Sequence, residues 1–174
     1  MRLGAKIFGA LAGVFILFLL LGWLLPGTWQ AEAETVLPAP PSKVFPFVNR
    51  MDLWVLWNPM PESGSESLGP EEGVGAGLQW SDPQYGEGRF QILVSEVDSI
   101  VEYQVLVEGG ALEVHGVISL SPEGGGTRLH WSEQGDFGRN PLMGYTARRM
   151  ASTQGEVMHS RLGALLARLA EESY

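Results

Sequence analysis

A run of glycines is the first feature of this sequence that could carry chemistry. The segment GVGAGLQW places them at Gly73, Gly75 and Gly77. Loops that bind phosphate through glycines follow a strand, open a helix and direct backbone N–H groups at the anion. Here the glycines lead into the strand-like segment LQWS, and no Lys-Ser or Lys-Thr pair follows them. We therefore interpret them as hairpin and strand glycines and not as a nucleotide-binding loop.

A lone carboxylate is the second feature. Glu133 follows the same strand alternation as Leu129 and Trp131, so its side chain is expected to point toward the interior. In an apolar pocket such a carboxylate would have a raised pKa and could act as a general acid or base. The alternative is a strand end in solvent, or an ion pair with an arginine of the last helix. We favour this alternative, because most carboxylates near a surface have structural partners.

Two histidines and an acid form the third feature. Glu113, His115 and His130 fall on adjacent predicted strands, on the face opposite Glu133. A metal site there is conceivable but weak, because it offers few ligands on a flat, solvated surface. The sequence contains no cysteine, which excludes disulfides, thiolate catalysis and zinc–thiolate sites. It also lacks HExxH, GxSxG and Walker patterns, so we expect no metal and no cofactor and assign no catalytic residue.

Length and charge limit the classes of partner. The chain has 174 residues and is 45% hydrophobic, enough for one domain with a core and an appendage. Its formal net charge of −9 becomes −11 when Arg2 and Lys6 are left out. Nucleic acid and anionic lipid surfaces are poor partners for such an acidic body.

The N-terminal residues 1–27 are predicted to form a transmembrane anchor. Arg2 and Lys6 precede an uncharged apolar run over residues 7–25, which as a helix spans about 30 Å, the thickness of a bilayer core. The positive residues place the N-terminus in the cytoplasm and the body outside, as a single-pass protein of the cell membrane. Trp23 and Trp29 would lie near the outer interface.

A cleaved signal peptide is the competing interpretation of this segment. Ala31-Glu32-Ala33 has the small-x-small form of a peptidase site. The apolar run is longer than a usual signal core, however, and the segment WQAEAETVL alternates like a strand that cleavage would cut. Both observations favour the uncleaved anchor.

Residues 28–174 are predicted to form one α+β domain. After a first strand, prolines near position 40 begin a helix and Pro46 interrupts it, which predicts two short helices. At least five strand-like runs follow, separated by Gly, Pro, Asp and Ser. From Pro141 onward, apolar residues recur at three- and four-residue steps, which indicates one long amphipathic helix. That helix would cover one face of a curved antiparallel sheet.

Turn positions predict which residues share the covered face. A turn at 109–110 pairs Tyr103 with Gly116, and a turn at 98–99 brings Val94 near Tyr103. A longer turn would set Ile118 near Leu129. The covered face is then expected to hold Leu78, Trp80, Phe90, Ile92, Val94, Tyr103, Val105, Val107, Leu112, Val114, Ile118, Leu129 and Trp131.

Aromatic residues on or near this face either pack in the core or line a cavity. Core packing is the ordinary role of any one of them. In a cavity, their indole N–H and phenol O–H groups would orient a mostly apolar ligand. Because Gly116 leaves space beside Tyr103, we expect open volume between it and the last helix. The candidate pocket residues are Trp54, Trp57, Trp80, Tyr103, Gly116, Trp131, Glu133, Met150 and Gln154.

Three segments together resemble a known group of proteins. They are VLPAPPSKVFPFVNRMDLWVLWNP, GPEEGVGAGLQWSDPQYGEGRFQI and ISLSPEGGGTRLHWSEQGDFG, followed by the closing helix. In this order they resemble the polyketide cyclase/dehydrase branch of the START-like, or SRPBCC, superfamily, from about Trp29 to the C-terminus. The resemblance implies a helix-grip fold, whose curved sheet wraps the last helix around a deep pocket for apolar ligands. It implies no universal catalytic residue.

The expected function is therefore a membrane-anchored, extracytoplasmic domain that binds a hydrophobic small molecule or lipid. A cyclase or dehydratase that moves protons with Glu133 or Tyr103 is the alternative. The small number of inward-facing titratable groups counts against the enzyme. A domain that only contacts a partner protein is a third possibility.

Overall fold

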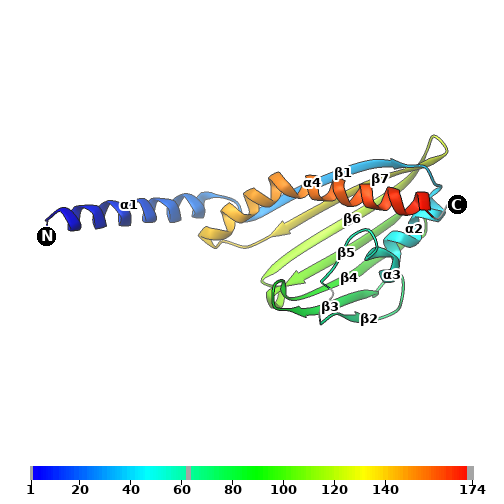
Figure 1. Ribbon diagram of the computed structural model, residues 1–174, viewed down its shortest axis with the longest axis horizontal. Coiled ribbons are helices and arrows are strands. Elements are labelled where there is room, and N and C mark those ends of the chain that lie inside the picture. Colours follow the sequence, from blue (N-terminus) through cyan, green and yellow to red (C-terminus); the bar gives the residue numbers. More distant parts are fainter. Residues whose placement is uncertain (1, 62–63, 172–174) are drawn as a thin grey trace.

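A long N-terminal helix leads into a domain in which a curved sheet holds a second long helix (Figure 1). The computed structural model describes residues 2–61 and 64–171. The elements are α1 (Arg2–Leu24), β1 (Thr28–Leu37), α2 (Pro41–Asn49), α3 (Met51–Trp54), β2 (Glu66–Leu68), β3 (Gly77–Asp82), β4 (Gly86–Glu96), β5 (Ile100–Val107), the 3₁₀ turn η1 (Glu108–Gly110), β6 (Leu112–Glu123), β7 (Gly126–Asp136) and α4 (Pro141–Glu171). The predicted order of elements is confirmed.

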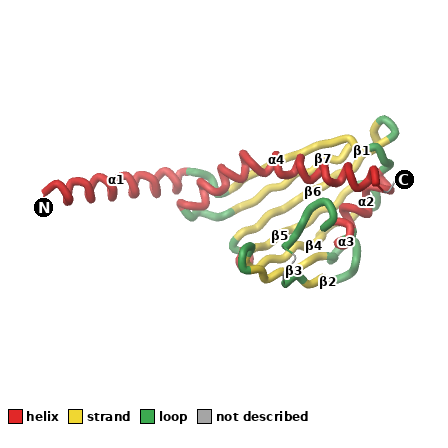
Figure 2. Tube along the Cα trace, viewed as in Figure 1, coloured by secondary structure: helices red, strands yellow, loops and turns green. Residues whose placement is uncertain are grey.

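The strands form one seven-stranded antiparallel sheet in the order β1-β7-β6-β5-β4-β3-β2. Strands β2 to β7 follow the chain, whereas β1 returns to pair with β7 along its full length. Helix α4 runs along β1 and β7, and α2 and α3 lie at the end of the sheet far from α1 (Figures 1 and 2). This is the predicted helix-grip arrangement of an α+β domain.

Register confirms most of the predicted face and corrects one residue. Tyr103 pairs with Gly116 as expected. In the β4–β5 hairpin, however, Tyr103 pairs with Ile92, and a bulge after Ile92 sets Val94 opposite Glu102. A bulge adds one residue to one strand, which turns the following side chains to the other face. Val94 therefore does not lie on the covered face.

The β6–β7 hairpin is tighter than the sequence suggested. Glu123 pairs with Gly126 across only Gly124 and Gly125, which have φ angles of 57° and 87°. Two consecutive residues with positive φ favour this kind of hairpin turn, and glycine adopts them without strain. Because the strands extend farther than expected, Ile118 pairs with Trp131 and not with Leu129; the facing side is unchanged.

The helices agree with the prediction in number and differ in detail. Pro46 lies within α2, and the break comes at Arg50, whose extended backbone separates α2 from α3. In α4 the buried positions include Met158, Leu162, Leu165 and Leu169, which follow each other at the three- and four-residue steps of one helical face. The glycine run also behaves as predicted, since Gly77 begins β3.

Burial divides the covered face into two parts, which we call the sealed half and the open half. The sealed half lies toward α2 and α3 and is fully buried. Its sheet residues are Phe90, Ile92, Val101, Tyr103, Ile118, Leu129 and Trp131. The open half lies toward α1, and its apolar side chains are only partly buried. They are Leu78, Val105, Val107, Leu112 and Val114 from the sheet, with Met143 and Met150 from α4.

Candidate ligand-binding site

A buried hydrogen-bonded chain connects β5, β7 and α4. The Trp131 indole Nε1–H donates to the Tyr103 hydroxyl oxygen at 2.7 Å. The Tyr103 hydroxyl donates to Glu133 Oε1 at 2.5 Å, and Gln154 Nε2 donates to Glu133 Oε2 at 2.8 Å. Strand alternation aims the three sheet residues at α4, because Gly116 on β6 pairs with both Tyr103 and Glu133. Four of the predicted pocket side chains therefore meet.

Burial decides the protonation behaviour of this chain. It raises the pKa of Glu133 above the usual glutamate value, although the hydrogen bonds from Tyr103 and Gln154 act in the opposite direction. Burial also holds the pKa of Tyr103 well above 10, helped by the neighbouring Glu133 carboxylate. Glu133 is thus neither a solvated strand end nor the ion-pair partner of an arginine, and the interpretation favoured from sequence is wrong. The hydrogen bond to Tyr103 crosses from β7 to β5, so the residue pattern of β7 alone could not predict it.

Aromatic rings fill the interior beside this chain. Trp54 packs on Trp57 and Tyr103 with ring centroids 5.0 and 5.2 Å apart, and Trp57 meets the Trp131 ring edge-on at 5.5 Å. The Trp57 indole N–H donates to the Phe47 carbonyl oxygen at 2.8 Å. Such offset and edge-on pairs are the favoured geometries of aromatic contact. For these four aromatic residues, the core-packing interpretation describes the structure.

Gly116 does not mark open volume, contrary to our expectation. A Cβ atom at Gly116 would collide with the Tyr103 ring, which lies across the glycine. The same arrangement recurs at Gly135 beneath the Trp29 ring and at Gly88 beneath the Trp80 ring. A cross-strand aromatic ring folds over a glycine because contact with the bare backbone buries both. Glycine opposite an aromatic residue therefore creates a place for the ring and not a cavity.

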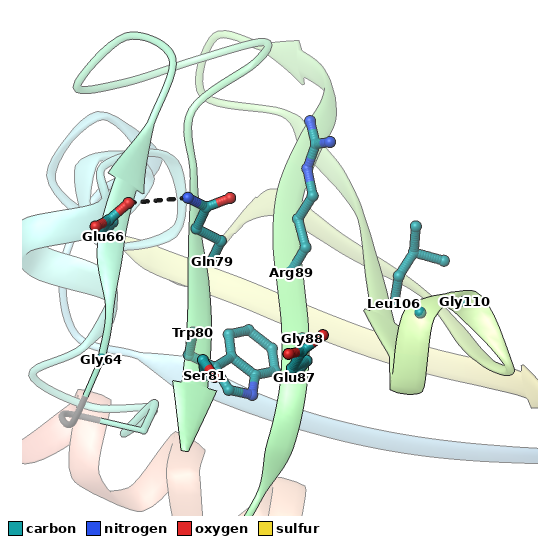
Figure 3. A pocket seen from close by; sticks show the side chains of 11 residues that line it. Gly64, Glu66, Gln79, Trp80, Ser81, Glu87, Gly88, Arg89, Leu106 and Gly110 are labelled. Carbon is teal, nitrogen blue, oxygen red and sulfur yellow. Dashed lines mark hydrogen bonds between the residues drawn. The ribbon is translucent and has the colours of Figure 1, made fainter.

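Trp80 and Met150 lie apart from the buried chain. The Trp80 ring reaches from β3 over Gly88 on β4 (Figure 3). It adjoins a shallow depression of about 480 Å³ at the β2–β4 side of the sheet, whose lining includes Glu66, Gln79 and Arg89. Met150 belongs to the open half. The structure thus separates the predicted pocket residues into a sealed group around Tyr103 and two residues nearer the exposed rim.

Comparison with known families identifies the group. Residues 28–172 match the family model described as polyketide cyclase / dehydrase and lipid transport. The chain belongs to this family. The family match agrees with the START-like, or SRPBCC, resemblance of the sequence and with the helix-grip architecture. No curated protein sequence matches the chain.

Solved structures share the fold of this family member at low sequence identity. Protein MLL2253 from Mesorhizobium loti is similar with a TM-score of 0.61 and 19% identity, over 82% of this chain and 97% of that one. A norcoclaurine synthase point mutant from Thalictrum flavum, solved with a transition-state analogue, is similar with a TM-score of 0.63 and 14% identity. That match covers 84% of this chain and 97% of the synthase. At such identities these likenesses establish the fold.

Trp29 is a site residue that sequence reasoning missed. We expected it at the membrane interface, but its side chain is only 4% exposed and its ring packs 6.2 Å from that of Phe137. It borders the open half, because its partner Gly135 pairs with Val114 on the other side. Its indole N–H has no hydrogen-bond partner in the part of the chain that the structure describes. The alternation of WQAEAETVL, in phase with buried Ala31 and Ala33, was the signal that could have placed it.

Histidine and glutamate side chains on the opposite face lie next to one another. His115 Nε2 lies 2.7 Å from Glu113 Oε1. His130 lies 3.9 Å from Glu32 and 3.8 Å from Glu34, so it does not join the other pair. Across residues 2–61 and 64–171, no group of three or more acidic or histidine side chains is arranged to hold a metal ion.

Proposed function

We propose that this protein is a membrane-anchored, extracytoplasmic domain that binds a hydrophobic small molecule or lipid on the open half. The observation that carries the proposal is the partial exposure of apolar residues on two elements, Val105, Val107 and Leu112 on the sheet and Met150 on α4. Covering such side chains contributes about 25 cal/mol per Å² of apolar area removed from water. The family match, whose description includes lipid transport, supports the same class of ligand.

Polar selection of the ligand is assigned to the rim and not to the buried chain. Both carboxylate oxygens of Glu133 already accept hydrogen bonds. The indole N–H groups of Trp29, Trp54 and Trp80 are buried without a partner among the described residues, and Trp29 and Trp80 are the two beside the open half. An unsatisfied buried donor costs about 1–3 kcal/mol, so a ligand oxygen that accepts from either indole would remove that cost. An apolar ligand with one or two acceptor oxygens fits this surface best.

The anchor is the second part of the proposal. Lys6–Leu24 forms one helix that is long and apolar enough to cross a membrane, and its side chains are mostly exposed, as at Phe8 with 75%. Cleavage after Ala33 would remove the first part of β1, which pairs with β7 from Thr28 onward and contains the buried Trp29. Losing a paired strand segment with a buried tryptophan would expose the core, which supports retention of the helix.

N-terminal sequencing of the mature protein tests the anchor. We expect the residues of α1 to be present in membrane fractions. A mature chain that begins at Glu34 would show a secreted domain and contradict the anchor.

Native mass spectrometry of the protein extracted in mild detergent tests the binding function. We expect an added mass from a co-purifying hydrophobic molecule, released when the domain is unfolded. Val107→Trp, which fills the open half, should lose the added mass, whereas Val97→Trp on the exposed β4–β5 turn should retain it. A ligand-free mass for the parent in several detergents would contradict the proposal.

An enzyme of the polyketide cyclase or dehydratase type is the second candidate. It is favoured by the raised pKa of Glu133 and its direct hydrogen bond to Tyr103, since such a pair can exchange a proton with a substrate. Glu133→Gln should then lower turnover by about 100-fold or more. A binding domain should instead keep its ligand in this variant, because apolar contact dominates affinity.

A further inference from the structure

Helix α4 is joined to the apolar helix α1 by specific contacts. The rings of Phe18 and Tyr145 stack with centroids 4.4 Å apart and an angle of 2° between their planes. The Tyr145 hydroxyl also donates to the Phe18 carbonyl oxygen at 2.8 Å. The directional hydrogen bond and the stacked rings together fix both the distance and the orientation of the two helices at this point.

Two glycines bring the helices together at the same place. A Cβ atom at Gly144 would lie 2.7 Å from the Gly22 carbonyl oxygen and 2.7 Å from the Leu25 Cβ atom. A Cβ atom at Gly22 would collide with the Pro141 carbonyl oxygen. Small residues that permit such close approach are typical of helix pairs within membranes. We call this contact, formed by Phe18, Gly22, Gly144 and Tyr145, the clamp.

The clamp places the beginning of α4 beside the apolar span. Phe18 lies six residues before Leu24, the last residue of α1, which corresponds to about 9 Å along the helix axis. Large apolar side chains are exposed at the same level, with Trp23 62% and Leu142 49% accessible. Figure 1 shows α1 leaving the domain at the end where α4 begins. With α1 in a bilayer, these side chains would lie among lipid headgroups and upper acyl chains.

Strand pairing brings the open half to that same end of the domain. Thr28, directly after the linker from α1, pairs with Asp136, and Asp136 pairs with Glu113. Glu113 adjoins Leu112, which pairs with Val107. The partly buried apolar side chains therefore lie at the end of the strands nearest the anchor, whereas the sealed half lies at the opposite end.

We propose that the clamp docks this edge of the domain on the bilayer surface, so that the open half receives its ligand from the membrane and not from water. The proposal rests on the proposed function, because α1 must be inserted. The docking force is apolar: the net charge of −9 gives no attraction to anionic lipid, while Leu142 at the start of α4 and Trp23 and Leu24 at the end of α1 all expose apolar side chains. A lipid whose acyl chain lies across Val107, Leu112 and Met150 is the occupant.

Site-directed fluorescence in vesicles tests the docking, and the absence of cysteine makes every introduced thiol unique. The full chain is reconstituted in phosphatidylcholine vesicles, with a bimane label at one of four positions. Ile16→Cys reports insertion of α1, Leu142→Cys the start of α4, and Leu112→Cys the open half. Val97→Cys, 77% exposed on the far turn, is the matched control. Nitroxide groups on the lipid acyl chains then quench labels that lipid reaches.

We expect strong quenching at Ile16→Cys, Leu142→Cys and Leu112→Cys and little at Val97→Cys. Quenching at Ile16→Cys alone, with Leu112→Cys no more quenched than Val97→Cys, would overturn the docking while leaving the anchor intact. Absence of quenching at Ile16→Cys would instead contradict the anchor of the proposed function. The two failures are therefore distinguishable in one series.

Clamp variants test whether this contact sets the orientation. Tyr145→Ala and Gly144→Leu should lose quenching at Leu112→Cys while keeping it at Ile16→Cys. In these variants α1 stays inserted, but the domain is no longer held in one orientation against the bilayer. Tyr145→Phe keeps the stacked ring and should retain part of the quenching. Unchanged quenching at Leu112→Cys in both Tyr145→Ala and Gly144→Leu would overturn the role of the clamp. Near-ultraviolet circular dichroism of each variant verifies that the domain is folded.

Discussion

The sealed and open halves of the same sheet face are built from similar strands and differ in what covers them. In the sealed half, α3 and the following segment bring Trp54 and Trp57 down onto Tyr103 and Trp131, and the interior is filled by rings. In the open half, Val105, Val107, Leu112 and Val114 stay partly exposed. The aromatic rings beside them, Trp29 and Trp80, lie instead over the glycines Gly135 and Gly88. On helix α4, Met158 and Leu162 are buried and Met150 is only partly buried, although Ala147, one turn before Met150, is buried.

This difference separates stability from binding along one sheet. A face that is packed with rings at van der Waals contact has no room for a ligand, and its side chains contribute to folding. A face whose apolar side chains are half covered contributes less to folding and retains apolar area for another molecule. Substitutions on the sealed side of the Tyr103–Gly116 pair should therefore affect mainly stability, and those on the open side should affect mainly binding.

Truncating a ring in the sealed half should give the largest effect. Trp57 is fully buried, and its indole donates a hydrogen bond to the Phe47 carbonyl oxygen. Trp57→Ala should lower the free energy of unfolding by about 3–5 kcal/mol. The matched change in the open half, Leu112→Ala, should cost roughly 1 kcal/mol, since the side chain is only partly buried. Urea unfolding of the detergent-solubilised chain measures both, and equal losses would remove the distinction between the halves.

Adding a side chain at Gly116 should be the next largest effect. Because the Tyr103 ring covers this glycine, Gly116→Leu overpacks the interior and should cost about 1–3 kcal/mol. It should also displace the Tyr103 hydroxyl from Glu133. Val114→Leu, on the neighbouring row of the open half, is the control and should be nearly neutral. A Gly116→Leu variant with the melting temperature of the parent would indicate a cavity that the structure does not show.

Filling the open half should affect binding more than stability. Val105→Trp should weaken binding of an apolar fluorescent probe by roughly tenfold, which corresponds to losing about 1.4 kcal/mol of apolar contact. The melting temperature should change little, because the side chain has room to extend. Titration of the probe into the parent, Val105→Trp and the exposed-turn control Val97→Trp measures this. Equal affinities in all three would place the probe elsewhere.

The pH dependence of stability should give the smallest effect. Burial raises the pKa of Glu133 in the folded state above the reference value of 4.5. Folding therefore favours the protonated form, so the stability of the parent should fall as pH rises from about 4.5 through the folded pKa. Glu133→Gln does not titrate and should flatten this part of the curve. Thermal unfolding between pH 4 and pH 8 compares the two, and parallel curves would show that Glu133 does not cause the dependence.

Local pattern was enough to predict most of the fold. Alternation identified the strands, the three- and four-residue steps identified α4, and turn positions paired Tyr103 with Gly116 and aimed Glu133 inward. Errors arose where an extra residue shifted the inward–outward alternation of a strand, or where the pairing of two strands had to be known. The bulge after Ile92 turned Val94 to the other face, and assigning Trp29 to the membrane interface ignored its phase within β1.

Within the candidate site, the sequence by itself determined which side chains face the helix, because strand alternation is a property of the backbone. Only the tertiary structure decided which of them are sealed. Trp54 and Trp57 come from a segment that has no register with the sheet, and the Tyr103 ring occupies the space over Gly116 because contacts between distant segments select its position. The sequence likewise determines the apolar length of α1. Its contact with Tyr145 depends on the tertiary structure, because the hydrogen bond joins residues 127 positions apart.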